Sequence, residues 1–147
     1  MKQNKSAFTL IELVFVIVIL GILASIAIPK FNATRVDAQI TKAKSDISAV
    51  RSAIINERQT RIIKGDSSFI SSLDDGASVN VEGETIFNNG LLVYGVKTKD
   101  SDGHWIKTGD NTYTFKVDGT SCEFTYNPDD GTFKLTSTQE ICKKIDD

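Results

Sequence analysis

One stretch decides the fold of this chain: Phe8-Thr-Leu-Ile-Glu12-Leu-Val-Phe-Val-Ile-Val-Ile-Leu-Gly21-Ile-Leu-Ala-Ser-Ile-Ala-Ile-Pro29. From Phe8 to Ile28 its side chains are almost wholly apolar. At about 1.5 Å per residue, a helix of this length measures about 30 Å, which matches the hydrocarbon layer of a bilayer. Because that layer offers the backbone no hydrogen-bond partners, the stretch is predicted to be a membrane-spanning helix.

The stretch contains a single charged residue, Glu12. An isolated carboxylate among lipid chains costs several kcal/mol. We therefore expect Glu12 to be either protonated or paired with a cation that the apolar stretch itself does not supply.

The residues Lys5-Ser-Ala-Phe-Thr-Leu-Ile-Glu12, followed by the apolar stretch, resemble the N-terminal signal of type IV pilins and type II secretion pseudopilins. The resemblance implies that a prepilin peptidase removes a leader, residues 1–7, by cutting between Ala7 and Phe8. It implies that the new amino group of Phe8 is then methylated, and that Glu12 pairs with this amino group in a neighbouring subunit during assembly. The chain departs from the family at Ala7, because glycine usually precedes the cut.

Two lysines, Lys2 and Lys5, precede the apolar stretch. Positive charge favours the cytoplasmic side, so we expect a cytoplasmic N-terminus, a single pass through the inner membrane over residues 8–30 and a periplasmic head. Gly21 and Pro29 are the predicted kink positions, because proline lacks the N–H that a helix uses.

An ordinary secretory signal peptide, cut after Ala27, is the alternative. It would release a soluble periplasmic binding protein. The length of the apolar stretch, the charge of Glu12 and the helical pattern that continues beyond Pro29 all favour the membrane-anchored interpretation.

The pattern beyond Pro29 predicts an amphipathic helix over residues 31–64. Its apolar residues are spaced by 4, 3, 4, 3 and 4 positions, which places them on one helix face: Val36, Ile40, Ala43, Ile47, Val50 and Ile54. The stripe is shorter than a coiled coil requires, so we expect it to pack on the chain's own sheet. Gly65-Asp66 is predicted to end the helix.

The rest of the chain predicts a small antiparallel sheet. Residues 65–90 indicate an irregular connection, with a brief helix near 68–73 and a short strand near Val79. Residues 91–135 favour strands, beginning with 91–96, and Asp118-Gly119 and Asp130-Gly131 are typical hairpin turns. A helix stripe and a sheet face that cover each other give an α+β fold with a head over residues 31–147. This arrangement is similar to that of the pilin family.

The chain has two cysteines, Cys122 and Cys142, and an exported domain with an even pair favours a disulfide. Such a bond would tie the tail, residues 136–147, to the sheet. Two unpaired buried thiols are the alternative.

No combination of residues indicates an enzyme or a cofactor. The net charge of −2 points to neither nucleic acid nor an acidic substrate. Asp100, Asp102, Asp129 and Asp130 lie in sequences that are similar to fragments of calcium loops, as some pseudopilin heads have, but hairpin turns are the favoured interpretation. His104 is expected at the surface. Lys97, Lys99 and Lys107 beside Trp105 are a weak candidate patch for DNA, and a solvated face is favoured.

The sequence thus predicts a pilin-like structural subunit, without catalytic residues, cofactor or metal. Its expected partners are further copies of itself and other pilin-like subunits in a filament, the prepilin peptidase and an inner-membrane assembly platform. The resemblance does not distinguish a type IV pilus from a type II secretion or DNA-uptake pseudopilus. A membrane-anchored enzyme is disfavoured by the lack of a catalytic constellation.

Overall fold

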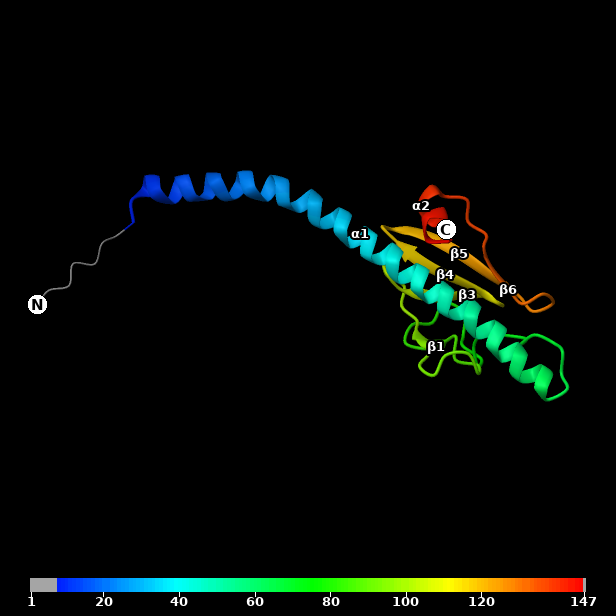
Figure 1. Ribbon diagram of the computed structural model, residues 1–147. Coiled ribbons are helices and arrows are strands. Elements are labelled where there is room, and N and C mark those ends of the chain that lie inside the picture. Colours follow the sequence, from blue (N-terminus) through cyan, green and yellow to red (C-terminus); the bar gives the residue numbers. More distant parts are fainter. Residues whose placement is uncertain (1–7, 147) are drawn as a thin grey trace, which may run out of the picture. The chain divides into compact units, whose positions relative to one another are not determined.

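The computed structural model describes residues 8–146, and its elements follow the order α1, β1 to β6, α2 (Figure 1). Residues up to Arg35 and residues from Val36 onward form two compact units. The two helices lie before and after the strands along the sequence, and the strands pair antiparallel. The fold class is therefore α+β, as predicted.

Helix α1 extends from Leu10 to Ile63, close to the predicted range of 8–64. It ends where Gly65 adopts a φ of +88°, a left-handed conformation that is easy only for glycine. The Gly65 N–H then donates to Ile62 O at 3.0 Å, which satisfies a carbonyl of the last turn. The helix is continuous past Gly21 and Pro29, and a kink there stays a prediction.

The main sheet has four antiparallel strands in the order β3-β4-β5-β6. The strands are β3 (Trp105–Gly109), β4 (Thr112–Val117), β5 (Thr120–Asn127) and β6 (Thr132–Leu135). The predicted hairpin at Asp118-Gly119 is confirmed: Val117 pairs with Thr120, and both turn residues have positive φ, as this two-residue turn requires. Asp130-Gly131 also lies in a turn, between Asn127 and Thr132.

The second half of α1 covers one face of this sheet. The predicted stripe supplies Ala43, Ile47, Val50 and Ile54 to the core, with Val36 and Ile40 packed at its edge. The sheet supplies large rings that are almost fully buried: Trp105, Tyr113, Phe115, Phe124, Tyr126 and Phe133. Several of these rings meet edge to face, such as Trp105 and Phe124 with centroids 5.5 Å apart.

Polar contacts fix the helix on the sheet. The buried Trp105 indole N–H donates to Asp46 Oδ2 at 3.0 Å. The Arg51 guanidinium donates to the Phe133 carbonyl at 3.0 and 2.8 Å from Nε and Nη2. These contacts satisfy groups that would otherwise be buried without a partner, so they favour one placement of the helix over others.

The connection between α1 and the sheet differs from the prediction. No helix forms at 68–73 and no strand at Val79. Instead, Asp66 and Ser72 side chains accept hydrogen bonds from the backbone N–H groups of Ser68 and Asp74, so these groups are not available to a helical ladder.

A separate two-stranded sheet forms within this connection, from β1 (Thr85–Ile86) and β2 (Val96–Lys97). The predicted strand over 91–96 is wrong except at its last residue. Positive φ values at Phe87 and Gly90 turn the chain back on itself, and the Leu92 N–H donates to Phe87 O at 3.1 Å. The residues between β1 and β2 therefore form a projecting turn.

The tail contains a short helix, α2 (Glu140–Asp146), that the sequence did not predict. A disulfide joins Cys142 on this helix to Cys122 on β5, as expected, with 5.3 Å between the Cα atoms. Cys142 and Ile145 are buried, so the tail covers part of the head's core.

Replacing both cysteines by serine should lower the free energy of unfolding of the head. The disulfide spans a sequence separation of 20 residues, and closing such a loop in the unfolded chain is worth about 3 kcal/mol. Denaturant unfolding of the detergent-solubilised protein measures the difference. Reductant should lower the free energy of unfolding of the unmodified protein and should leave that of the double variant unchanged. Equal free energies of unfolding of the unmodified protein and the double variant without reductant would show that the bond does not stabilise the head.

Candidate assembly surface

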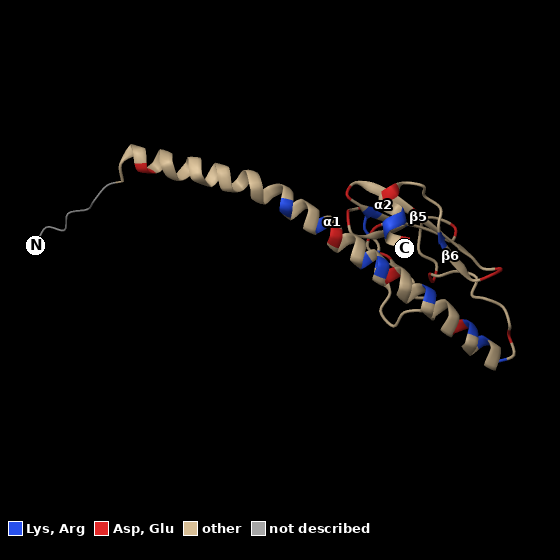
Figure 2. Cartoon of the chain, turned by 45° about the horizontal axis from the view of Figure 1, so that its top comes forward, with Lys and Arg blue, Asp and Glu red and all other residues tan. Residues whose placement is uncertain are grey.

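The first half of α1 has no cover within the chain. Every large apolar side chain from Phe8 to Phe31 is exposed, by between 39% for Val14 and 85% for Phe8. Among the described residues, α1 is the one helix that is long and apolar enough to cross a membrane. Charged side chains are absent between Glu12 and Lys30, as Figure 2 shows. This segment, residues 8–28, must be covered by lipid or by other proteins, because so large an apolar surface is unstable in water.

Glu12 caps the start of this helix. The Thr9 backbone N–H donates to Glu12 Oε2 at 2.8 Å, and the Thr9 hydroxyl donates to the same oxygen at 2.7 Å. In return, the Glu12 N–H donates to Thr9 Oγ1 at 3.3 Å. This reciprocal capping box satisfies backbone donors of the first turn, and the sequence pattern Thr-x-x-Glu carries its signature. It was not predicted from the sequence.

The capping box supplies Glu12 with hydrogen bonds but with no positive charge. Among residues 8–146, Glu12 forms no ion pair. The Glu12 carboxylate lies at the N-terminal end of the segment. It is therefore accessible for the predicted pairing with a Phe8 amino group of another subunit. The predicted cleavage site is only half described: Phe8 is exposed, and Ala7 lies outside the described residues.

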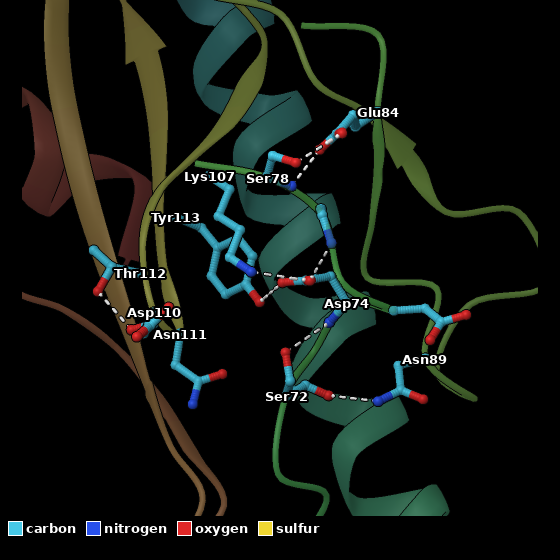
Figure 3. A network of polar contacts seen from close by, with 12 residues as sticks. Ser72, Asp74, Ser78, Glu84, Asn89, Lys107, Asp110, Asn111, Thr112 and Tyr113 are labelled. Atoms are coloured by element: carbon cyan, nitrogen blue, oxygen red, sulfur yellow. Dashed lines mark hydrogen bonds and ion pairs between the residues drawn. The ribbon is translucent and has the colours of Figure 1, made fainter. Parts of the chain in front are cut away.

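The head contains one buried charged cluster, formed by Asp74, Lys107 and Tyr113 among the residues described (Figure 3). The Lys107 ammonium donates to Asp74 Oδ1 at 3.0 Å, and the Tyr113 hydroxyl donates to Oδ2 at 2.5 Å. The Ala77 N–H adds a third donor at 2.8 Å. The carboxylate thereby joins the irregular connection to strands β3 and β4.

This cluster is arranged for stability. Burial raises the pKa of Asp74, but the hydrogen bonds from Tyr113, Lys107 and Ala77 outweigh burial and hold the pKa below its ordinary value of 3.8. Burial, together with the adjacent carboxylate, raises the pKa of Tyr113 far above 10. Asp74 is thus ionised and Tyr113 neutral at physiological pH. Both side chains are engaged in hydrogen bonds within the cluster.

The acidic turns predicted as weak calcium candidates are not brought together. Asp102 accepts a hydrogen bond from the Gly119 N–H at the start of β5, whereas Asp130 accepts one from the Thr132 N–H beyond the end of β5. Asp100 pairs with Lys116, and the Asp129 N–H donates to Asn127 Oδ1. Within residues 8–146, no group of three or more metal-ligating side chains is assembled.

The candidate DNA patch is only partly exposed, because Lys97 and Lys99 lie at the surface and Trp105 and Lys107 do not. Trp105 is fully buried and Lys107 is occupied by Asp74. Lys97 Nζ donates to Thr85 Oγ1 at 2.7 Å. His104, predicted at the surface, is half-buried, and its Nδ1 lies 3.1 Å from Ser101 Oγ.

Comparisons with known proteins find a known family motif at the N-terminus of this chain. A prokaryotic N-terminal methylation motif matches residues 2–28. The chain is 33% identical over 140 residues to a fimbrial protein of Pseudomonas aeruginosa, covering 87% of this chain and 90% of that protein. It is 43% identical over 53 residues to type II secretion system core protein G of the same species, covering 36% and 37%.

A type IV major fimbrial protein of Dichelobacter nodosus is 43% identical over 54 residues, which is 37% of this chain and 35% of that protein. No solved structure matches the chain.

Replacing Tyr113 by phenylalanine should destabilise the head by roughly 1 kcal/mol near pH 7, because Asp74 loses a donor. The loss should shrink as the pH falls below about 4. A carboxylate whose pKa is depressed by folding stabilises the protein above its unfolded pKa, and this contribution disappears as it protonates. Unfolding curves recorded between pH 3 and pH 7 measure both effects.

Tyr94→Phe is the matched control, because Tyr94 is 89% exposed. It should leave stability unchanged at every pH. If Tyr113→Phe behaved like this control, the Asp74 cluster would not be stabilising.

Proposed function

Because this chain belongs to the family of type IV pilins and type II secretion pseudopilins, we propose that it is a filament subunit of a type IV pilus. Members of the family are structural subunits and not enzymes, and this chain is one of them. The family implies assembly with other subunits. The particular filament, the processing steps and the partners are what we propose here.

The observation that carries the proposal is the uncovered apolar half of α1. Segments 8–28 of neighbouring subunits replace lipid contacts when they pack together, so the same surface serves as a membrane anchor before assembly and as the filament core afterwards. Each subunit contacts the next through unlike surfaces, and a contact of this kind that does not close into a ring gives an open fibre.

The extent of similarity favours a pilus over a secretion pseudopilus. The similarity to the fimbrial protein extends through the head, over 87% of the chain, whereas the similarity to secretion protein G covers 36%. The head forms the surface of the filament, so the similarity that includes the head is the better guide to the kind of filament. A DNA-uptake pseudopilus is the second candidate.

We further propose that the chain is made as a prepilin with its N-terminus in the cytoplasm. Lys2 and Lys5 favour this orientation. The disulfide between Cys122 and Cys142 supports a head outside the cytoplasm, because such bonds persist in oxidising compartments. Prepilin peptidase would cut between Ala7 and Phe8, and an inner-membrane platform would then assemble the mature subunits.

In this proposal, Glu12 sets the register between subunits. Its carboxylate accepts hydrogen bonds from Thr9 and forms no ion pair among residues 8–146. The amino group that processing creates on Phe8 supplies a positive charge at the same depth in a neighbouring subunit. A charge pair in an apolar core is favourable mainly because each charge alone is so costly there, and this makes the pairing selective for one register.

Replacing Glu12 by valine should leave the subunit processed and membrane-bound but should reduce filament yield to a small fraction of the unmodified level. The charge that selects the register is lost, while the apolar segment stays long enough to span the bilayer. Sheared filaments and membrane-bound subunit, quantified on the same cells, measure the effect.

Leu13→Val is the matched control, since it changes a neighbouring apolar residue of the same segment without altering charge. It should assemble normally. Filament yield from Glu12→Val equal to that of this control would contradict the role of Glu12 in register.

Deletion of the gene should abolish surface pili and leave type II secretion intact. Electron microscopy of the cells, assays of secreted enzymes and transformation frequency separate the three machines. A secretion defect with normal pili would assign the subunit to a pseudopilus instead, and a loss of transformation alone would assign it to DNA uptake.

A further inference from the structure

We propose that Lys30 and the hollow beside it bind the phosphate headgroup of an anionic phospholipid at the outer surface of the inner membrane. The hollow has a volume of about 360 Å³ and is lined by Ala27, Lys30, Phe31 and Thr34. The inference rests on the proposed function, because it requires that residues 8–28 lie in the bilayer. It names a lipid partner of the subunit before assembly.

Lys30 lies at the depth that lipid headgroups occupy. The stretch 13–29, between Glu12 and Lys30, contains no charged residue, and Figure 2 shows it as a long tan part of α1. From position 12 to position 30 the helix advances 18 residues, which is about 27 Å and close to the hydrocarbon thickness of about 30 Å. When Glu12 is at the inner boundary of this layer, Lys30 therefore reaches the outer boundary, where phosphate groups lie.

The charges near this boundary favour an anionic partner. Between Glu12 and Asp37 the charged residues are Lys30 and Arg35, and both are basic. Within the described part of the chain, residues 8–146, Lys30 forms no ion pair. Basic side chains at a membrane surface are attracted to anionic lipids, so a lipid phosphate supplies the counter-charge of Lys30.

The two walls of the hollow match the two parts of a phospholipid. Ala27 and Phe31, one helical turn apart, form an apolar wall, and Phe31 is 74% exposed. Lys30 and Thr34 form the polar wall. The Thr34 hydroxyl already donates to the Lys30 carbonyl at 3.1 Å, so the Lys30 ammonium is the group that donates to a phosphate oxygen.

A lipid satisfies both walls at once. Its acyl chain lies against Phe31 and the apolar segment, while its phosphate meets the ammonium that the long Lys30 side chain extends toward the headgroups. A free anion would leave Phe31 in water. The chemistry of the hollow therefore selects a membrane lipid over a soluble phosphate.

A second copy of the chain fits this hollow less well than lipid does. Over residues 8–36 another copy offers one carboxylate, that of Glu12. The proposed assembly pairs this carboxylate with the amino group of Phe8. A phosphate of the surrounding membrane needs no second subunit, so the contact exists before assembly.

The contact replaces a function of the leader. In the proposed pathway, cleavage after Ala7 removes Lys2 and Lys5, the basic residues that precede the apolar segment. Lys30 remains in the mature subunit. Its contact with a headgroup at the outer surface then keeps the segment at one depth in the bilayer until the subunit enters the filament.

Native mass spectrometry tests the site with the full chain, purified in detergent and mixed with equal amounts of phosphatidylglycerol and phosphatidylcholine. The first lipid carries a net negative charge and the second carries none, so the unmodified chain should retain more phosphatidylglycerol. Lys30→Gln should lower this retention about fivefold, which corresponds to about 1 kcal/mol. Lys30→Arg keeps the charge and should bind as the unmodified chain does.

Lys44→Gln is the matched control, because Lys44 is an exposed lysine on the same helix and its replacement removes the same charge. This variant should retain phosphatidylglycerol like the unmodified chain. Equal retention by Lys30→Gln and Lys44→Gln would overturn the inference. Equal retention of the two lipids by the unmodified chain would overturn it as well.

Glycerol phosphate distinguishes a lipid site from a site for free anions, because it has the phosphate but no acyl chains. An excess of it should not displace phosphatidylglycerol from the unmodified chain, and displacement would overturn the assignment to lipid. The outcome is separate from filament assembly. A chain that forms filaments without a headgroup preference contradicts this inference alone, whereas a chain that retains phosphatidylglycerol and forms no filaments in cells contradicts the proposed function.

Discussion

An apolar helical segment that its own chain cannot cover is the constraint on which the rest of this protein depends. Residues 8–28 expose a continuous hydrophobic surface, and Glu12 is the only charge within it. So large an apolar surface is unstable in water, so it must be covered by lipid or by other helices. The capping box between Thr9 and Glu12 keeps the first turn satisfied in the bilayer and leaves the carboxylate oxygen oriented at the end of the segment where processing would create an amino group.

The second half of the same helix has the opposite character. Its stripe is buried by the head's sheet, and Asp46 and Arg51 form hydrogen bonds with Trp105 and with the Phe133 carbonyl. The head is further closed by the disulfide and by the buried Asp74 cluster. One helix thus contributes to a core made within the chain and to a surface that is completed only by other molecules.

Periodicity and turn chemistry predicted the parts of the fold that depend on local sequence. The helix stripe, the glycine at the end of α1 and the Asp118-Gly119 hairpin follow from rules that involve a few neighbouring residues. The connection from 65 to 104 could not be predicted, because its conformation depends on distant contacts. Phe87 adopts a φ of +58°, unusual for a bulky residue, and its ring packs on Trp105, Tyr113 and Phe133. Of the candidate assembly surface, Glu12 and the apolar segment were evident from the sequence, whereas the capping box between Thr9 and Glu12 was not predicted.

The N-terminus of the mature protein tests the central claim most directly, because every role assigned to the apolar segment requires that the segment be retained. Mass spectrometry of the purified protein, with sequencing of its N-terminal peptide, identifies the first residue. The account predicts that the mature chain begins at Phe8 with a methylated amino group. A chain that begins at Ile28 would have lost the segment through ordinary signal cleavage, and this result would contradict the account.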